Sequence, residues 1–332
     1  MPVGLFLGLT LLYLAMVWLA LAAPWPLAIV LSPLSGVVIG ILFIAGHDAC
    51  HNSFTAWPRL NQIIGRIAFL PSLHSFTTWA IGHNQMHHRY NSLRGWDAVW
   101  EPLSPEDYRA RGSFRRMLYR FHRSPAGVPF YYMMVLWAPY HCAAVPFIRR
   151  NMTPMFLPDL ILVLLFFGCQ ILAVTAVGAS FGHGALASLT IGIVVPFLVW
   201  NGLMSMIVFL HHTHPALHWY PDLDAWKAGR GAVNGSAHVR FASPIGAMVL
   251  RIMEHNAHHA APGVPFYNLV RMQSAMAARE DLLSWGFSFR AFVRICKRCE
   301  LYDYDAGRWV TFQSAAAQPV EPAAAAAAAA AN

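Results

Sequence analysis

Four stretches of this chain are apolar over about 20 residues each, and they limit the folds open to it more than any other feature. A helix rises about 1.5 Å per residue, so about 20 apolar residues cross the roughly 30 Å hydrocarbon layer of a membrane. None of the four contains a charged residue. We therefore predict four transmembrane helices, at 3–23, 27–46, 160–180 and 186–210.

The segments between these stretches differ in length and charge. Short, uncharged turns at 24–26 and 181–184 join them into pairs. Of the 23 lysines and arginines, 12 lie in 47–158 and 11 in 211–332. Cationic loops stay on the cytoplasmic side of a membrane. We expect an all-α integral membrane protein whose four transmembrane helices form two hairpins, with both termini and a helical cap on the cytoplasmic side.

Two more stretches, 63–81 and 128–148, are apolar but interrupted by Pro71 and Pro139. We expect them to lie in the membrane interface, and an additional pair of spans is the alternative. Residues 313–332 form a low-complexity tail rich in alanine and proline. The predicted organisation is one domain over 1–312 followed by this tail.

Composition excludes an ordinary soluble globule. Hydrophobic residues make up 57% of the chain and charged residues only 11%, whereas soluble domains are about 25% charged. The net charge of +8 follows the membrane topology, so we expect no nucleic-acid partner. The five cysteines are odd in number and scattered, and we interpret them as reduced thiols.

Of the 17 histidines, 11 fall in four clusters, each at the end of a predicted span or in a predicted cytoplasmic loop. The clusters are 47–51 (HDACH), 83–88 (HNQMHH), 211–214 (HHTH) and 255–259 (HNAHH). We interpret the remaining six as interfacial anchors, which are His74, His122, His141, His183, His218 and His238.

The spacing within the clusters suits metal binding, because residues four apart on a helix share a face. It predicts three imidazole pairs, His47 with His51, His83 with His87, and His255 with His259. His88 and His258 lie beside these faces. Such a set offers about eight or nine nitrogens, more than the four that a single zinc takes, so two metals are expected. Iron is favoured because its open positions bind and activate oxygen.

Three carboxylates lie inside or near the clusters. We expect Asp48, Asp97 and Glu254 to accept hydrogen bonds from the imidazole N–H groups of metal ligands. The alternative is that they pair with nearby arginines.

These clusters and the residues around them resemble the membrane fatty acid desaturases, in particular the bacterial acyl-lipid delta-12 (omega-6) group. The resemblance covers roughly residues 40–312. It rests on 47–54 (HDACHNSF), on 83–102 with its DAVWEP end, on 212–215 (HTHP), on 255–269 (HNAHHAAPGVPFYNL) and on 294–312 (RICKRCELYDYDAGRWVTF). Two departures concern the outcome of the reaction. The spacing from His83 to His87 is nearer to that of hydroxylases, and His211 stands where many relatives have glutamine.

The resemblance implies two non-haem iron ions. Their ligands would be His47, His51, His83, His87, His88, His212, His255, His258 and His259, with His211 and His214 as further candidates. It implies an enzyme that uses O2 and two external electrons to insert a cis double bond into a lipid acyl chain. The alternative is a hydroxylase or ketolase of the same di-iron type, acting on a fatty acid, alkane or carotenoid.

The resemblance also implies a partner and a location. A separate ferredoxin, rubredoxin or cytochrome b5-type donor, with its reductase, would supply the electrons. The aromatic-rich segments around Trp79, Trp96, Trp100 and Trp200 are candidate walls of an acyl channel, and the alternative is that these tryptophans are anchors at the membrane interface. Six arginines from Arg109 to Arg123 would contact anionic lipid or, as the alternative, an acidic donor. The protein would be a multi-pass protein of the bacterial inner membrane, with its active site on the cytoplasmic side.

Overall fold

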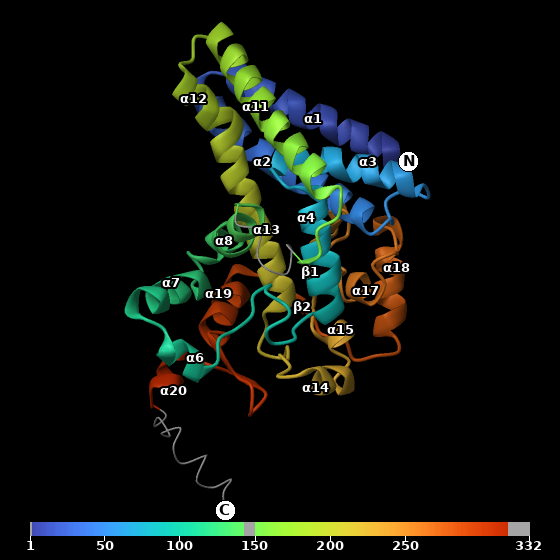
Figure 1. Cartoon of the computed structure of the whole chain (residues 1–332), viewed down its shortest axis with the longest axis vertical. Helices are drawn as coiled ribbons and strands as arrows, with labels where there is room; N and C mark the ends of the chain where they lie inside the picture. The colour runs from blue at the N-terminus through green and yellow to red at the C-terminus, as the bar shows by residue number, and fades with distance from the viewer. Residues whose placement is uncertain (1, 143–149, 318–332) are drawn as a thin grey trace, which may run out of the picture.

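The computed structural model describes residues 2–142 and 150–317 (Figure 1). Four helices in this part of the chain are long and apolar enough to cross a membrane, as predicted. They are α1 (Pro2–Ala22), α2 (Trp25–Cys50), α11 (Phe156–Ser180) and the continuous run Ala185–His212. The last run comprises α12 (Ala185–Leu189), the π-helical η4 (Thr190–Val194) and α13 (Val195–His212).

Two of these helices continue beyond the apolar stretches. Helix α2 has 26 residues, about 39 Å at the usual rise. It includes His47 and ends at Cys50. Helix α13 includes His211 and His212 in its last turn. The first and third histidine clusters were expected just outside the spans, but they begin within the final turns of the helices. A helix ends where its backbone hydrogen bonds end, which need not coincide with the end of its apolar residues.

The apolar helices gather in the upper part of Figure 1, and the shorter elements lie below them. Helix α2 packs against α1 on one side and α13 on another. At Gly36 of α2 an added Cβ would lie 2.5 Å from the carbonyl oxygen of Pro196 and 2.8 Å from Cβ of Val199. The two backbones therefore approach closely because residue 36 has no side chain.

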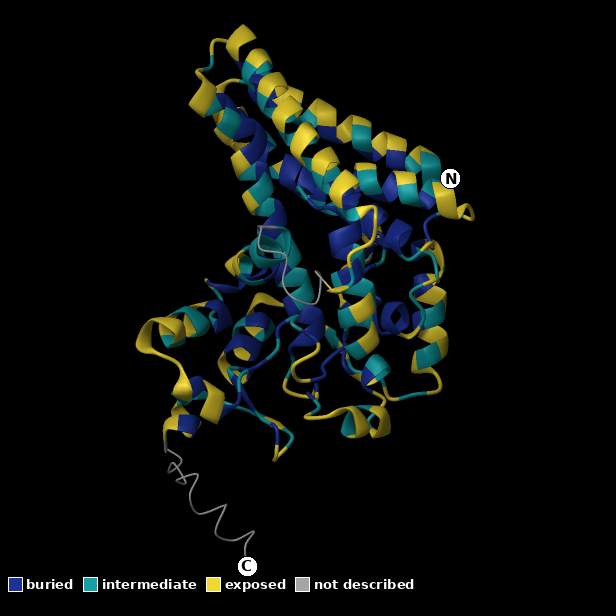
Figure 2. Cartoon of the chain, in the orientation of Figure 1, coloured by how far each residue is buried: buried dark blue, intermediate teal, exposed yellow. Residues whose placement is uncertain are grey.

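The upper helices carry many exposed residues (Figure 2), and large apolar residues are among them. Leu11 and Leu14 of α1 are 66% and 57% exposed, and Leu164 and Leu172 of α11 are 60% and 70% exposed. A belt of this kind would be unfavourable in water and suits contact with lipid. The arrangement of the apolar surface thus agrees with a membrane protein.

The two interrupted stretches form short helices. The first contains most of α3 (Pro58–Phe69), the 3-10 turn η1 (Leu70–Ser72), and α4 (Phe76–Ala80), which continues into the π-helical η2 (Ile81–His87) and α5 (His88–Tyr90). The second begins with α8 (Val128–Tyr131), the π-helical η3 (Tyr132–Trp137) and α9 (Ala138–Cys142); its remainder lies outside the described residues. Within the described part, neither forms a span-length apolar helix.

The lower part holds the remaining elements. Its helices are α6 (Pro105–Ala110), α7 (Ser113–Arg123), α14 (Leu223–Ala228), α15 (Gly231–Asn234), α16 (Ser243–Met248), α17 (His255–Ala260), α18 (Phe266–Ala277), α19 (Phe289–Arg298) and α20 (Phe312–Ala317). Strand β1 (His238–Arg240) pairs in parallel with β2 (Ser284–Gly286), and β3 (Leu301–Asp303) pairs antiparallel with β4 (Arg308–Val310).

The protein is mostly helical but contains two small sheets, so the expectation of an all-α protein needs correction. The β3–β4 hairpin turns at Gly307, whose φ of 62° favours glycine, and pairs Tyr302 with Trp309. The expected tail begins inside α20, where Ala315 is 2% exposed and its carbonyl accepts a hydrogen bond from Arg109. Residues 318–332 lie outside the described part.

Candidate metal centre

Nine histidines converge into two neighbouring groups, each of which could hold a metal ion. The first group is His47, His51, His83, His88 and His258, and the second is His87, His212, His255 and His259. Within each group the candidate ligand nitrogens lie within 4.8 Å of one another. These are the same nine histidines that the sequence singled out, brought together from α2, η2, α5, α13 and α17.

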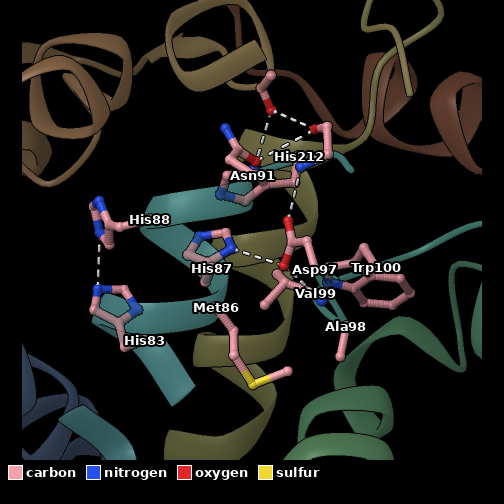
Figure 3. Close-up of polar contacts among 12 residues, drawn as sticks. His83, Met86, His87, His88, Asn91, Asp97, Ala98, Val99, Trp100 and His212 are labelled. Carbon is pink, nitrogen blue, oxygen red and sulfur yellow. Dashed lines mark hydrogen bonds and ion pairs between the residues drawn. The ribbon is translucent and has the colours of Figure 1, made fainter. Parts of the chain in front are cut away.

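The first group is assembled from three parts of the chain. His47 and His51 lie one turn apart at the end of α2, with ring centroids 4.9 Å apart. Nε2 of His88 lies 3.0 Å from Nε2 of His83 (Figure 3) and 3.0 Å from Nε2 of His258. The ring centroid of His258 also lies 4.4 Å from that of His47, so the first, second and fourth clusters all meet in this group.

The pairing of His83 differs from the prediction. It was expected to act with His87, four residues on, but it shares its group with His88, five residues on. The reason is that η2 is π-helical, with backbone hydrogen bonds between residues five apart. This winding directs His87 into the second group, so one short segment contributes to both.

The second group is fully buried. Nε2 of His255 lies 2.9 Å from Nε2 of His212 and 3.1 Å from Nε2 of His259. His255 and His259 are the predicted pair on α17. His212 joins them from the end of α13, and His87 from η2, with rings 4.6 Å apart.

The hydrogen bonds of these rings test whether a cation fits. Nδ1 of His212 lies 3.2 Å from the carbonyl oxygen of Gly235, and Nδ1 of His255 lies 3.3 Å from that of Ile252. A carbonyl only accepts, so both Nδ1 atoms carry the hydrogen and both Nε2 atoms of the neutral rings carry lone pairs. Two lone pairs 2.9 Å apart repel each other unless a cation lies between the rings' donor atoms. The donor set therefore fits a metal.

Burial also keeps the imidazoles neutral, as ligands must be. For six of the nine rings, loss of hydration is the largest cause that lowers the pKa, and neighbouring imidazoles lower it further. This holds for His51, His83, His88, His255, His258 and His259.

Two of the three predicted carboxylates contact these histidines. Oδ1 of Asp48 accepts a hydrogen bond of 3.1 Å from Nδ1 of His47, and Oδ1 of Asp97 accepts one of 3.0 Å from Nδ1 of His87 (Figure 3). The backbone N–H of Ser92 donates to Oδ2 of Asp97. Both carboxylates are buried, at 2% and 0% exposure. They orient the rings and hold the hydrogen on Nδ1, which leaves Nε2 free for a metal.

Glu254 lies at the N-terminus of α17, directly before His255. Its Oε2 is buried and has no hydrogen-bond partner among the described residues. Burial raises the pKa of this carboxyl. Glu254 thus lies next to the second group, but its Oε2 accepts no hydrogen bond from a histidine among the described residues.

His211 and His214 lie outside both groups. His211 is 0% exposed and stacks on His255 with ring centroids 3.9 Å apart. Neither of its ring nitrogens has a hydrogen-bond partner in the described part of the chain. His214 stacks on Trp285, and its Nδ1 accepts a hydrogen bond from the backbone N–H of Ala216.

A cavity of about 250 Å³ opens onto both groups. Apolar side chains of α2, η3 and α13 form most of its wall, and His47, His83, His87, His212 and His255 lie along it. On α13 the lining residues Trp200, Met204, Ile207, Val208 and His211 follow the period of one helix face. The sequence alone does not single out this stripe, because most of α13 is apolar and its other faces carry the same residue types.

The four tryptophans expected to line an acyl channel divide into two sets. Trp79 and Trp200 line the cavity. Trp96 is 47% exposed, and Trp100 is buried against Tyr131, with ring centroids 3.7 Å apart. The segment between Trp96 and Trp100 does line the cavity, through Asp97, Ala98 and Val99, although the two tryptophan side chains do not.

The interpretation as interfacial anchors needs correction for two of the six histidines. His74 is 1% exposed and His122 is 5% exposed, so neither reaches an interface with water. Nε2 of His183 lies 2.8 Å from the carbonyl oxygen of Leu21. Because a carbonyl only accepts, His183 is the donor, and it ties the 181–184 turn to α1.

The fold and the centre together define a helical membrane protein with a buried polyhistidine site. The model of the fatty acid desaturase family matches residues 23–290. The chain therefore belongs to the fatty acid desaturase family.

Several characterised proteins are similar over most of the chain. An sn-1 oleoyl-lipid 12-desaturase of Arthrospira platensis is 28% identical over 76% of this chain and 69% of its own length. A protein of the same name from Synechocystis sp. is 26% identical over 89% of this chain and 80% of its own length. The chloroplastic omega-6 fatty acid desaturase of Arabidopsis thaliana is 26% identical over 90% of this chain and 64% of its own length.

Proposed function

We propose that this protein is a membrane di-iron fatty acid desaturase that inserts a cis double bond into a lipid acyl chain, using O2 and two external electrons. The observation that carries the proposal is the convergence of nine histidines into two adjoining groups beside an apolar cavity. An unactivated C–H bond has no acidic proton, so acid–base groups cannot break it and a metal–oxygen oxidant is needed. Membership of the desaturase family supports the same chemistry.

Each histidine group would hold one iron. When bound, the two irons would activate O2 for removal of two hydrogens from adjacent methylenes, with release of water. Asp48 and Asp97 keep the hydrogen on Nδ1 of His47 and His87, and so present Nε2 to the metal. Zinc is less suitable because it has no redox chemistry.

The cavity would hold the acyl chain. Its wall is apolar, so a saturated chain displaces water from it without loss of hydrogen bonds. From Trp200 to His211, α13 runs along the cavity for about 16 Å at the usual helical rise. Rigid helical walls keep the chain extended beside the histidines and exclude water from the site of oxidation.

The topology follows from the charge distribution. We place the two helix pairs as hairpins in the bilayer, with the cap, both histidine groups and both termini on the cytoplasmic side of a bacterial inner membrane. The absence of lysine and arginine from 1–46 and 159–210 supports this orientation. We retain 1–312 as the desaturase domain and 313–332 as a tail.

Electrons would come from a separate ferredoxin, rubredoxin or cytochrome b5-type donor with its reductase. The six arginines from 109 to 123, an alternative docking surface for this donor, differ in their exposure and contacts. Arg123 is buried and donates to the carbonyls of Trp100 and Glu101, and Arg120 donates to the phenol oxygen of Tyr108. Arg111 and Arg115 are exposed. The exposed members would contact anionic lipid headgroups, as favoured from the sequence.

The relatives named 12-desaturase and omega-6 desaturase suggest the position of the double bond. We propose delta-12 (omega-6) specificity toward acyl chains carried by membrane lipids. The test is expression in a bacterium that lacks desaturases, together with a ferredoxin and reductase, followed by gas chromatography and mass spectrometry of total fatty acids.

A new cis double bond, located by derivatisation, would support the function and give its position. A hydroxylated or ketone product would instead identify the hydroxylase or ketolase alternative. Purified protein without bound iron would contradict the di-iron proposal in either form.

A further inference from the structure

Tyr132 and His74 form a buried phenol–imidazole pair at the wall of the cavity. Tyr132 lines the cavity and is 6% exposed, and His74 is 1% exposed. The phenol oxygen lies 2.9 Å from Nε2 of His74. Neither residue belongs to the two histidine groups, and desaturation as described above does not use them.

The second nitrogen of His74 determines the direction of this hydrogen bond. Nδ1 lies 2.8 Å from the carbonyl oxygen of Ser72, so Nδ1 carries a hydrogen. Burial lowers the pKa of His74, which keeps the ring neutral with its lone pair on Nε2. Tyr132 therefore donates its phenolic hydrogen to His74. Burial also raises the pKa of Tyr132, so the phenol does not ionise on its own.

Trp79 connects this pair to the first histidine group. Its indole stacks on the ring of His83, with centroids 4.0 Å apart and planes inclined by 23°. The indole also lies beside the phenol of Tyr132, and both residues line the cavity. Phe43 packs between them, 5.3 Å from Trp79 and 5.1 Å from His74 by ring centroids. Ring contacts thus run without a break from a candidate metal ligand to His74.

Such a series of rings would carry electrons to the metal centre, and the electron balance of O2 reduction shows when they are needed. Reduction of one O2 to two waters takes four electrons. In desaturation the donor supplies two of them, and the acyl chain supplies two with two protons. If O2 reacts while the cavity holds no acyl chain, its complete reduction to water needs a second electron pair from the donor or from the protein. Incomplete reduction leaves peroxide-level oxidants that would damage the nearest side chains.

We propose that Trp79, Tyr132 and His74 form a protective oxidation relay that supplies an electron to the metal centre when O2 reacts there without an acyl chain. This inference rests on the proposed function. The electron leaves Tyr132 through Trp79, and the phenolic proton moves to Nε2 of His74. Tyr132 becomes a neutral tyrosyl radical and His74 an imidazolium, while oxygen gains one electron. Two further electrons from the donor complete the reduction of oxygen and, with the proton returned from His74, restore the phenol.

The neighbouring Tyr131 provides a matched control. Tyr131 is also buried among aromatic side chains. Its phenol donates a hydrogen bond of 3.0 Å to the carbonyl oxygen of Ala98. A backbone carbonyl accepts a hydrogen bond but does not take up the proton. Tyr131 therefore lacks the base that makes oxidation of Tyr132 favourable.

The test uses the full-length protein in detergent, loaded with ferrous iron, depleted of lipid acyl substrate, mixed with O2 and frozen. Electron paramagnetic resonance should show a tyrosyl radical in the wild type and in Tyr131→Phe. The signal should be lost in Tyr132→Phe, and in His74→Phe because the proton acceptor is gone. Iron per chain is measured for each variant, and only variants that bind as much iron as the wild type are compared.

A second readout is independent of the radical signal. Met86 and Met204 line the cavity, and methionine sulfoxide is readily measured by peptide mass spectrometry. After repeated exposure to O2 without substrate, Tyr132→Phe should accumulate more sulfoxide at both methionines than Tyr131→Phe. Met117 of α7, which is 60% exposed and is not among the residues that line the cavity, should not differ.

The outcomes separate this inference from the function on which it rests. A wild-type protein that forms product with substrate, yet shows no tyrosyl radical without it, overturns the relay and leaves the desaturase proposal standing. A radical that persists in Tyr132→Phe overturns the relay as well. Failure of the wild type to bind iron overturns both proposals.

Discussion

Replacement of Asp97 by asparagine should weaken metal binding at the second histidine group while preserving the fold. The Asp97 carboxylate accepts three hydrogen bonds, from Nδ1 of His87 and the backbone N–H of Val99 at Oδ1, and from the backbone N–H of Ser92 at Oδ2, each at 3.0 Å. Asparagine has almost the same shape but only one accepting oxygen. Its amide group must therefore face either the His87 N–H or the Ser92 N–H, donor against donor.

The magnitude follows from the loss of the group that orients His87. Removing such a partner usually lowers metal affinity about 10- to 100-fold, which corresponds to about 1.4 to 2.7 kcal/mol. The first group does not use Asp97, so it should keep its affinity. At limiting ferrous iron, Asp97→Asn should therefore bind about one iron per chain where the wild type binds two.

The assay is anaerobic equilibrium dialysis against ferrous iron, with metal measured by mass spectrometry. Asp305→Asn serves as the control, because Asp305 is exposed and lies outside both groups. Melting temperature identifies any general loss of stability. If Asp97→Asn bound two irons with unchanged affinity, the argument that this carboxylate holds His87 for a metal would be wrong.

Four further predictions concern the same framework. His258→Ala should abolish desaturation and remove about half of the bound iron, because the first group loses a ligand; full activity would exclude His258 as a ligand. His211→Gln should keep both irons, since His211 lies outside both groups, and loss of iron would identify it as a ligand after all. Gly36→Ala should destabilise the protein by about 1 to 3 kcal/mol, because its Cβ meets the backbone of α13. Gly4→Ala, which meets nothing within 4 Å, should not lower the melting temperature. Burial raises the pKa of Glu101 from 4.5 to about 7, so this group protonates more readily in the folded state and its contribution to stability falls as pH rises from about 4.5 to about 7. Glu101→Gln should therefore gain stability relative to the wild type across that range, and parallel pH profiles of the two proteins would contradict the assignment.

Much of the site could be predicted because histidine clusters are rare and their chemistry is specific. Eight of the nine histidines correspond to residues that the spacing within the clusters singled out, and His212 to a ligand that the family resemblance implied. Asp48 and Asp97 had been singled out because they lie inside or near the clusters. Single residues without a cluster were harder. Trp100, His74 and His122 are buried in the cap or beside the cavity, although residue type and position suggested a channel wall or the membrane interface. Their burial depends on which elements pack over them, and this packing cannot be predicted from the neighbouring residues in the sequence.

Regular helical spacing was also an incomplete guide. A four-residue interval correctly paired His47 with His51 and His255 with His259. It failed at His83, because η2 winds as a π-helix and aligns residue 83 with residue 88. A π-helical turn is stabilised by its tertiary surroundings, since its backbone geometry is less favourable than that of an α-helix. Nothing in the local sequence distinguishes the two forms.

The amino-acid sequence by itself determined that this chain crosses a membrane and carries a polyhistidine centre. Both follow from local properties, namely the length of apolar runs and the intervals between ligands. Only the tertiary structure decided how the nine histidines divide into groups of five and four, and which residues wall the cavity between α2, η3 and α13. The physical reason is that each group joins segments up to about two hundred residues apart, and the packing of whole helices sets those distances.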